Sequence, residues 1–400
     1  MSGRTLALGI YLPVVVFEIG MGALLPVVAL SAVDLGASLA MAGVVVALGG
    51  IGQILGDVPA GALAMRLGDR RAMLAAACAS VLALVGAALA PNVAVLAVCL
   101  LLLGAINAVF TLARHSYLTE TTPVERRART LSTLAGLQRI GTFIGPFLGA
   151  AVIHLSDVRS AYWLAVVTSV ITAVVVAVVP DDVPHTVRLV TTTARQVLVD
   201  HRQVFLTLGV AVLLVGAARG ARQTVLPLWG EHLGIAPATT SVIFGISGAV
   251  DMLLFYPAGK LMDRRGRLWT AVPSMLVLAA GFVVLPLTTT AATLAWAAAL
   301  IGLGNGMGSG ILMTLGADVA PPAARAQFLG IWRLCQDAGY AAGPLVVAAG
   351  AALGSLAAGV LTMAGVAAAS AAALARWAPR WSVHASRRTR QRARDAGLLQ

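Results

Sequence analysis

Long apolar runs dominate this sequence and limit what it can fold into. Twelve stretches of about 20 residues each, the length that a helix needs to cross the hydrocarbon core of a bilayer, are separated by short charged or turn-forming segments. The runs are continuous rather than alternating, which excludes a membrane barrel and favours helices that satisfy their own backbone hydrogen bonds in lipid. We therefore predict an all-α membrane protein with twelve transmembrane helices.

Composition agrees with this prediction, because only 11% of the 400 residues are charged and 59% are hydrophobic, which excludes a soluble enzyme. The predicted spans are Leu6 to Leu30, Leu39 to Ala64, Ala72 to Leu89, Val93 to Ala113, Leu131 to Ile153, Ala161 to Val179, Val204 to Trp229, Ser241 to Leu261, Leu268 to Leu287, Ala292 to Gly316, Phe328 to Ala352 and Ser355 to Leu374. We expect a first six-helix half over residues 1–180, a cytoplasmic linker over 181–202, a second half over 203–376 and an arginine-rich cytoplasmic tail over 377–400.

The basic residues predict the orientation of the spans. Of the 28 lysines and arginines, 23 lie in the termini and in alternate loops, and Arg159 alone lies in the opposite set. Because basic residues near span ends stay on the cytoplasmic side, both termini are predicted to be cytoplasmic, in the inner or plasma membrane. The arginines of the tail are expected to lie against anionic headgroups rather than to bind nucleic acid.

An internal repeat relates the two predicted halves. Sliding the chain by 198 residues without gaps superimposes residues of the loops as well as of the spans. The matched pairs include Pro59 with Pro257, Gly104 with Gly302, Asn107 with Asn305, Gln138 with Gln336, and Pro146 with Pro344. One offset across loops and spans indicates two pseudo-symmetric halves, a parallel repeat of the kind that major facilitator transporters carry.

The loop after the second span of each half carries a motif. The segment from Gly61 to Arg71, with Arg66 and Gly68, and the segment from Gly259 to Arg267, with Asp263, Arg264 and Gly266, resemble the signature loop of the major facilitator superfamily. The resemblance implies that Asp263 caps a neighbouring helix and helps to latch the cytoplasmic side. Its counterpart in the first half is Met65, for which Asp57 or Asp69 can substitute.

A second motif lies in the fifth span. Gly141, Gly145, Pro146 and Gly149 resemble the glycine-proline motif of drug/proton antiporters of this superfamily. Glycines spaced by four residues share one helix face, where another backbone can approach closely, so helix packing alone also explains them. In the tenth span, Gly302, Gly306 and Gly310 are interpreted as a similar packing face.

Apart from Asp57 and Lys260, which lie toward the cytoplasmic ends of their spans, seven ionisable residues fall inside the predicted spans, where each costs about 2.5 to 3.5 kcal/mol at mid-helix. They are Glu18, Arg139, Arg219, Arg222, Asp251, Arg333 and Asp337. Glu18 is the first candidate for a proton carrier, with Asp251 and Asp337 behind it. Static salt bridges that only fix the register of the helices are the alternative.

Depth in the membrane suggests partners for these charges. We predict an Arg139–Asp251 pair between the halves, with Gln53 facing Asp337 on the pseudo-symmetric side. Arg219 and Arg222 are expected to lie at the same depth as Glu18. Arg333 and Asp337 can also meet on their own helix, four residues apart. In the fourth span, Asn107 and Arg114 share a face, and Arg114 lies either at the inner mouth of the cavity or as a cytoplasmic anchor.

The resemblance implies a secondary transporter that works by alternating access, with small-molecule substrate bound between the halves. We expect proton-coupled efflux of drug-like or amphipathic compounds, by a monomer in the bilayer without cofactor, metal or nucleic acid. The small excess of basic over acidic residues in the spans motivates the alternative, a transporter of an anionic metabolite. A polytopic membrane enzyme or a sensor is the alternative from another class.

Overall fold

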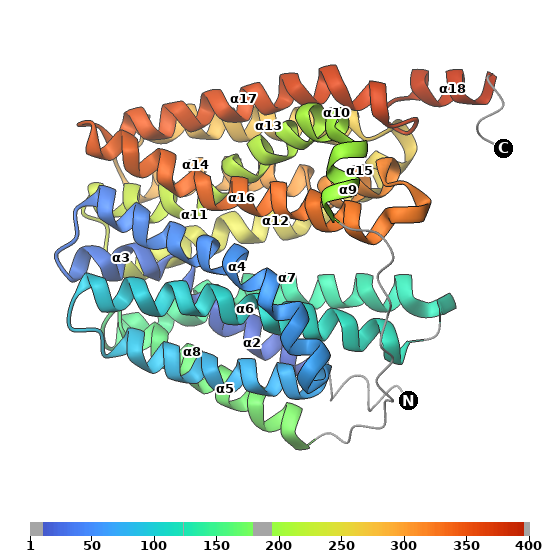
Figure 1. Ribbon diagram of the computed structural model, residues 1–400. Helices are drawn as coiled ribbons and strands as arrows, with labels where there is room; N and C mark the ends of the chain where they lie inside the picture. The colour runs from blue at the N-terminus through green and yellow to red at the C-terminus, as the bar shows by residue number, and fades with distance from the viewer. Residues whose placement is uncertain (1–10, 123, 179–193, 396–400) are drawn as a thin grey trace. The chain divides into compact units, whose positions relative to one another are not determined.

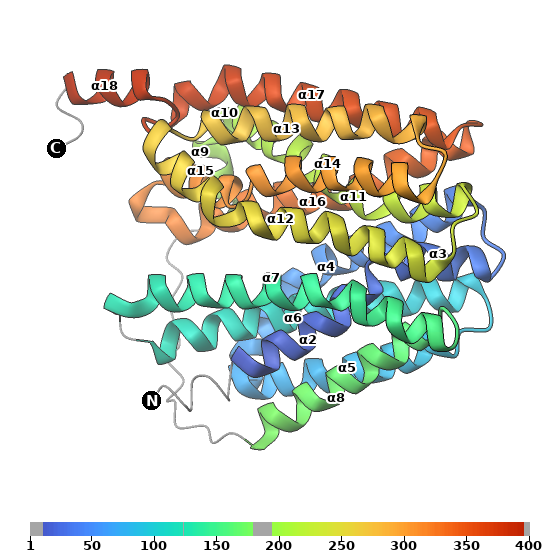
Figure 2. The same ribbon diagram turned by 180° about the vertical axis from the view of Figure 1, so that it is seen from behind.

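The computed structural model describes residues 11–122, 124–178 and 194–395, and within these ranges the chain forms helices and no strand (Figures 1 and 2). The long helices are α2 (Leu12–Leu24), α3 (Val27–Asp34), α4 (Leu39–Leu67), α5 (Asp69–Ala88), α6 (Val93–Thr121), α7 (Val124–Leu155), α8 (Ser160–Val178), α11 (Val210–His232), α12 (Pro237–Arg265), α13 (Leu268–Val284), α14 (Ala291–Met307), α15 (Ile311–Val319), α16 (Arg325–Ala352), α17 (Leu356–Trp381) and α18 (Arg387–Asp395). The short elements are α9 (Ala194–Asp200), α10 (Arg202–Val204), a π-helical turn (Phe205–Gly209) and the 3-10 turns Leu285–Leu287 and Pro322–Ala324. Residues 181–193 of the predicted linker lie outside the described residues.

Ten helical segments of the described chain are long and apolar enough to cross a membrane. The bent pair α2 and α3, which meet at 43° where Pro26 precedes α3, raises the number to eleven if the pair is one span. The ten do not include α16, which covers the predicted eleventh span and carries Arg333 and Asp337. The all-helical membrane fold is therefore confirmed, and the number of twelve spans stays a prediction.

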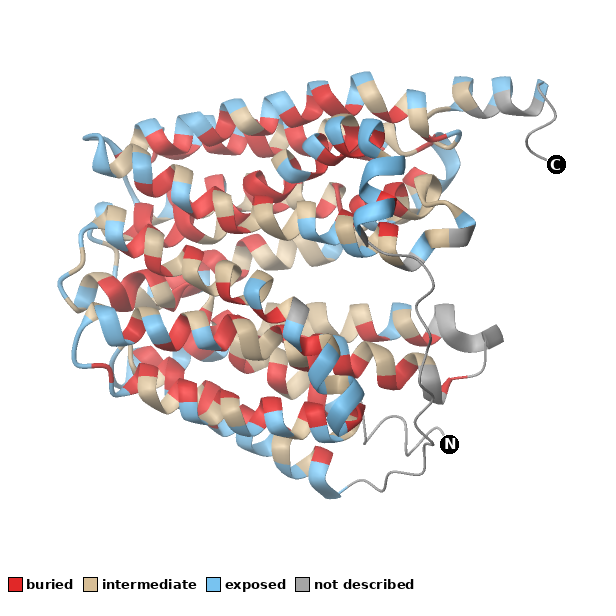
Figure 3. Cartoon of the chain, in the orientation of Figure 1, coloured by how far each residue is buried: buried red, intermediate tan, exposed pale blue. Residues whose placement is uncertain are grey.

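The helices cluster into two compact units, each with its own buried interior (Figure 3). Unit 1 contains the described part of Met1–Arg188 together with Leu226–Gly245, and unit 2 contains Leu189–Val225 together with Ile246–Gln400 up to residue 395. In unit 1, α2 packs on α7 and α8, while α6 packs on α4 and α5. In unit 2, α13 packs on α14 and α17, and α16 packs on α17.

Glycines of α7 allow a close contact with α2 in unit 1, as the glycine-proline motif predicts. A Cβ added at Gly145 would lie 2.5 Å from the Ile19 carbonyl oxygen, and one at Gly141 would lie 2.8 Å from the Val15 carbonyl oxygen. Because real Cβ atoms do not approach backbone so closely, only glycine lets α7 lie against α2. Helix α7 runs through Pro146 as one element.

The same contacts recur in unit 2 at the offset of the repeat. Gly343, the counterpart of Gly145, lies against the Ala217 carbonyl oxygen, and Ala217 is the counterpart of Ile19. Likewise Gly104 lies against Gly49, and Gly302 lies against Ser247. The repeat found in the sequence therefore extends to pairs of contacting residues.

The tenth predicted span is broken rather than continuous. Helix α14 ends at Met307 and α15 begins at Ile311, with Gly310 in the left-handed conformation at φ +78°. A Cβ at Gly310 would meet nothing within 4 Å, so the interpretation of Gly310 as part of a packing face is wrong. Glycine is favoured here because L residues rarely adopt this conformation, whereas Gly302 and Gly306 do pack closely against α12.

Candidate functional site

A buried ion pair joins two helices of unit 1. Nη1 of Arg114 on α6 donates to Oε1 of Glu18 on α2 at 2.8 Å, and the two side chains are 2% and 15% exposed. The Arg114 guanidinium also lies 5.7 Å from the centre of the Phe110 ring, which stacks on Phe17. Low exposure strengthens the attraction between such charges, and it also makes the loss of either partner costly.

Two side chains of α7 complete the surroundings of Glu18. Gln138 Nε2 donates to Glu18 Oε1 at 3.1 Å, and Thr142 Oγ1 donates to Oε2 at 3.4 Å. We call Glu18, Arg114, Gln138 and Thr142 the Glu18 cluster. Three donors, one each from Arg114, Gln138 and Thr142, therefore point at the two carboxylate oxygens of Glu18.

The burial of Arg114 corrects one interpretation of the sequence. An anchor at the cytoplasmic surface requires an exposed guanidinium, and Arg114 is among the largest fully buried side chains of the described residues. The arginine that pairs with Glu18 within unit 1 is therefore Arg114, whereas the sequence pointed to Arg219 and Arg222. Those two arginines have partners within unit 2.

Unit 2 holds a second carboxylate cluster, formed around Asp251 on α12. Nη1 of Arg222 on α11 lies 3.2 Å from Asp251 Oδ2, and their side chains are 12% and 15% exposed. Asn305 Nδ2 donates to the same oxygen at 2.6 Å, and Ser309 Oγ donates to Oδ1 at 3.4 Å. We call Asp251, Arg222, Asn305 and Ser309 the Asp251 cluster.

The break between α14 and α15 lies beside this cluster. Asn305 is in the last turn of α14, and Ser309 is in the break itself. Nη2 of Arg219 donates to the Gly308 carbonyl oxygen at 2.6 Å, just beyond the end of α14, and the same oxygen accepts from the Ile311 N–H at 3.2 Å. Two arginines of α11 therefore hold the broken segment, one through a carbonyl and one through Asp251.

The repeat relates a neutral amide pair in unit 1 to part of the Asp251 cluster. Asn107 Nδ2 donates to Gln53 Oε1 at 3.5 Å, between α6 and α4. Adding 198 to both numbers gives Asn305 and Asp251, which make the shorter hydrogen bond of 2.6 Å. The same position thus carries an amide in one unit and a carboxylate in the other.

The remaining charges of the spans lie on α7 and α16. Arg333 Nε donates to Asp337 Oδ2 at 3.3 Å, which confirms the predicted contact on one helix, with Arg333 half-exposed and Asp337 mostly buried. The predicted Arg139–Asp251 and Gln53–Asp337 pairs would join the two units and stay predictions. Among the described residues, no group of three or more His, Cys, Asp or Glu side chains could hold a metal ion.

The signature loop of unit 2 is held by a different acidic residue from the one the motif implies. Asp263 is 76% exposed and accepts from Arg267 Nη1 at 3.2 Å. The mostly buried partner of Arg267 is Asp318, which accepts from Nε at 3.1 Å and from Nη2 at 3.4 Å. Arg267 thus bridges the exposed Asp263 and the mostly buried Asp318.

The other residues of the two signature loops have simpler surroundings. Arg66 and Arg264 are exposed, and Gly61 and Gly259 have room for a Cβ. Gly68 and Gly266, which the repeat superimposes, both have positive φ where their helices end. Met65 is 77% exposed, and Asp69 is buried in the first turn of α5, where a helix favours negative charge.

Sequence reasoning missed four polar residues of these sites. Gln138 appeared only as a match of the repeat, and Thr142 lay unnoticed inside the glycine-proline motif. Asp318 likewise appeared only as a match of the repeat, with Glu120, and Ser309 carried no signal of its own. Their roles follow from which helices are neighbours, and hydropathy does not give that.

These features define a polytopic, all-helical membrane transporter built from a duplicated unit, with ion pairs inside its spans. The chain belongs to the major facilitator superfamily, whose family model matches residues 10–344. No curated protein matches the chain by sequence. The match to the superfamily extends over both units.

Solved structures of transporters share the fold. The nucleoside transporter NupG has a TM-score of 0.73 at 15% identity, with 94% of this chain and 99% of that chain covered. A POT family transporter in complex with a thioalcohol-conjugated peptide has a TM-score of 0.76 at 14% identity, with coverage of 94% and 96%. A D-xylose–proton symporter has a TM-score of 0.70 at 16% identity, with coverage of 95% and 97%. At these identities the likeness establishes the fold alone.

Proposed function

We propose that this transporter exports small drug-like or amphipathic compounds in exchange for protons, by alternating access in the cell membrane. The observation that carries the proposal is a mostly buried carboxylate–arginine pair between candidate membrane spans in each unit, Glu18–Arg114 and Asp251–Arg222. Charges inside spans are expensive, and a carboxylate that changes its protonation can release its arginine. Reversible protonation of such a pair can couple transport to a proton gradient.

Glu18 is the first proton carrier in this scheme, and Asp251 is the second. Protonation of Glu18 removes the negative charge that Arg114, Gln138 and Thr142 stabilise, so it weakens the link between α2, α6 and α7. Protonation of Asp251 has the same effect on Arg222 and Asn305. Each step shifts the helices that the cluster joins, which is how a proton biases one access state over the other.

The polar residues of the spans serve substrate binding in the same scheme. Asn107, Arg139 and Arg219 are proposed to line the cavity, together with Asn305 and the arginines of the two ion pairs. Asp337, which pairs with Arg333 on α16, is proposed as a third proton-coupling residue. Both termini are proposed to face the cytoplasm, and the monomer is the working unit.

An anionic metabolite is the second candidate substrate. When Arg114 is added to the seven charges named above, the set comprises five arginines against three carboxylates, and the excess of positive charge favours an anion. The five are Arg114, Arg139, Arg219, Arg222 and Arg333, and the three are Glu18, Asp251 and Asp337. Competition of transport by organic anions and by lipophilic cations distinguishes the two candidates.

The experiment is transport by the purified protein in vesicles with an imposed pH gradient. Candidate substrates first come from an efflux screen in cells that overproduce or lack the protein, with and without an uncoupler. We expect transport that collapses with the uncoupler and that Glu18→Gln abolishes, while Asp34→Asn, an exposed carboxylate at the end of α3, retains it. Transport indifferent to the uncoupler would overturn proton coupling.

A further inference from the structure

The segment between α17 and α18 is hydrogen-bonded to the signature loop of unit 2. The backbone N–H of Arg267 donates to the His384 carbonyl oxygen at 3.2 Å, and that of Leu268 donates to the Ala385 carbonyl oxygen at 3.0 Å. A Cβ at Gly266 would lie 2.8 Å from the Ser386 Cα, so only glycine permits this approach. We call the contact between residues 266–268 and residues 382–386 the tail clasp.

A side-chain network reinforces the tail clasp. Ser382 Oγ donates to Asp318 Oδ2 at 2.9 Å, and the same oxygen accepts from Arg267 Nε at 3.1 Å. Asp318 therefore joins the signature loop to the tail through two hydrogen bonds. Since Ser382 and Asp318 are both mostly buried, this link is protected from competition by water.

Helix α18 begins directly after the tail clasp. The first turn of α18 is hydrogen-bonded to the preceding residues of the tail. Thr389 Oγ1 donates to the Val383 carbonyl oxygen at 2.9 Å, and the Thr389 N–H donates to Ser386 Oγ at 3.2 Å. Arg387, Arg388 and Arg392 are exposed, and no carboxylate of the described chain pairs with them. The sequence adds Arg390 and Arg394 to the same nine-residue helix.

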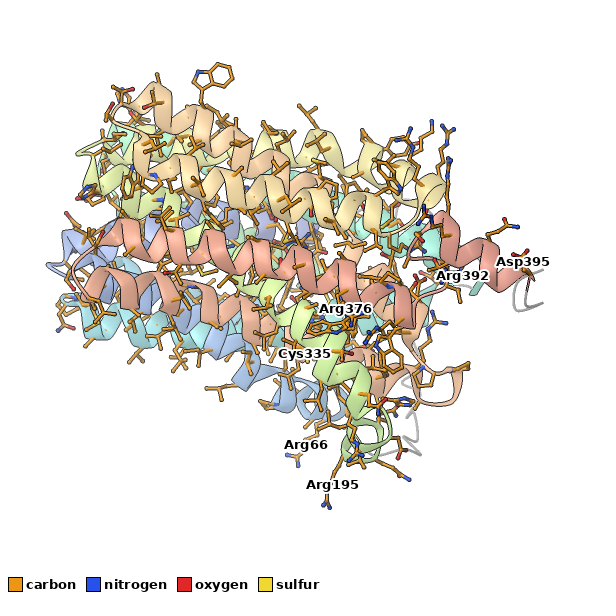
Figure 4. The ribbon with its side chains drawn as sticks, turned by 90° about the horizontal axis from the view of Figure 1, so that it is seen from above. Arg66, Arg195, Cys335, Arg376, Arg392 and Asp395 are labelled. Atoms are coloured by element: carbon orange, nitrogen blue, oxygen red, sulfur yellow. The ribbon has the colours of Figure 1, made fainter. Side chains whose placement is uncertain are left out.

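The position of α18 determines which anion its arginines can reach. Helix α17, a candidate membrane span, ends at Trp381, and α18 starts six residues later at Arg387. Figure 4 shows Arg392 and Asp395 on α18, which extends beyond the end of α17. A basic helix within a few residues of a span end lies at the headgroup level, where each arginine is attracted by anionic lipid.

We propose that α18 binds anionic phospholipid headgroups and that the tail clasp transmits this binding to the signature loop. The five arginines supply the charge complementarity, and Arg387, Arg388 and Arg392 are exposed while Thr389 is held by residues 383 and 386. Headgroup binding orders α18, and an ordered α18 holds residues 382–386 against residues 266–268. The effect on transport rests on the proposed function, whereas the lipid binding does not.

Hydrogen exchange of the full chain in lipid nanodiscs tests the proposal. Nanodiscs expose both faces of the membrane to solvent. We compare discs of phosphatidylcholine alone with discs that also contain phosphatidylglycerol. We expect the amides of α18 and those of Arg267 and Leu268 to exchange about tenfold more slowly with the anionic lipid, and the protection to fade with salt. Equal exchange in both kinds of disc overturns the proposal.

Variants separate lipid binding from transmission. Arg387→Gln/Arg388→Gln/Arg392→Gln is expected to remove the lipid effect, whereas the control Arg195→Gln/Arg202→Gln/Arg376→Gln, which removes equal charge at exposed sites, retains it. Ser382→Ala is expected to leave α18 protected while the amides of Arg267 and Leu268 lose their lipid response. If the control variant loses the lipid-dependent slowing of exchange as fully as the α18 variant does, the proposal is contradicted. It is also contradicted if RNA, added to discs of phosphatidylcholine alone, slows amide exchange as much as anionic lipid does.

Discussion

Asn305 donates a hydrogen bond of 2.6 Å to the carboxylate of Asp251, at the position where the repeat places Asn107 and Gln53. Two copies of one ancestral unit therefore use the same contact between their second and fourth spans. In the first copy both partners are amides, and in the second one partner is a carboxylate that also contacts Arg222. This asymmetry leads to the first prediction.

Asp251→Asn replaces the carboxylate by the amide that unit 1 uses. The hydrogen bonds to Asn305 and Ser309 can persist in part, so we expect the protein to fold, while Arg222 loses its counter-charge. Gradient-driven transport should fall about tenfold or more, the size of effect for losing a hydrogen bond between charged groups at ~1.5 to 3 kcal/mol, and substrate exchange without a gradient should continue. Vesicle assays of both processes check this, and full gradient-driven transport by Asp251→Asn contradicts a coupling role.

Glu18→Gln leaves Arg114 buried without its counter-charge, and we expect a loss of about 3–5 kcal/mol in stability. The double variant Glu18→Gln/Arg114→Met removes both charges, so it should recover most of that stability. Thermal unfolding in detergent measures both effects. If the double variant is as unstable as the single one, the cost does not come from the unpaired arginine.

The Glu18 cluster is expected to affect transport and stability separately. The double variant Glu18→Gln/Arg114→Met is expected to remain uncoupled from the proton gradient although it regains stability. Transport in vesicles with an imposed pH gradient checks this, with Asp34→Asn as the exposed carboxylate control. Recovery of coupling in the double variant would assign Glu18 a purely structural role.

Gly145→Ala should push α7 away from α2, because the added methyl group would meet the Ile19 carbonyl oxygen. Overpacking of this kind costs about 1–3 kcal/mol. Gly136→Ala on the same helix is the matched control, since a Cβ there meets nothing within 4 Å and alanine favours a helix. Unfolding temperatures of the two variants test whether Gly145 is needed for the packing of α7 on α2. Equal unfolding temperatures would refute this packing role.

Gly310→Ala places a side chain at φ +78°, which is expected to cost about 1–2 kcal/mol although there is space for the methyl group. Gly365→Ala on α17 also has space and has no positive φ, so it should leave stability unchanged or raise it. Denaturation of both variants in detergent tests the broken form of the tenth span. A neutral Gly310→Ala would indicate that α14 and α15 can join as one helix.

Local sequence determined where the helices lie and how the chain is duplicated. Apolar length sets the spans through the thickness of the bilayer, and the 198-residue repeat predicts equivalent contacts such as Gly145 with Ile19 and Gly343 with Ala217. The glycine spacing of α7 also identified its packing face. These properties depend on neighbours along the chain and on the lipid, so they can be read without knowing which helices touch.

Tertiary structure alone decided the partners of the charges. Glu18 and Arg114 are 96 residues apart, and Arg267 meets Asp318 and the tail through residues that carry no motif. Which arginine reaches a carboxylate depends on the neighbours and the rotation of each helix, and a rotation of one residue, about 100°, redirects a side chain entirely. The hydropathy pattern does not determine the rotation of a helix about its axis, because lipid solvates every apolar face alike.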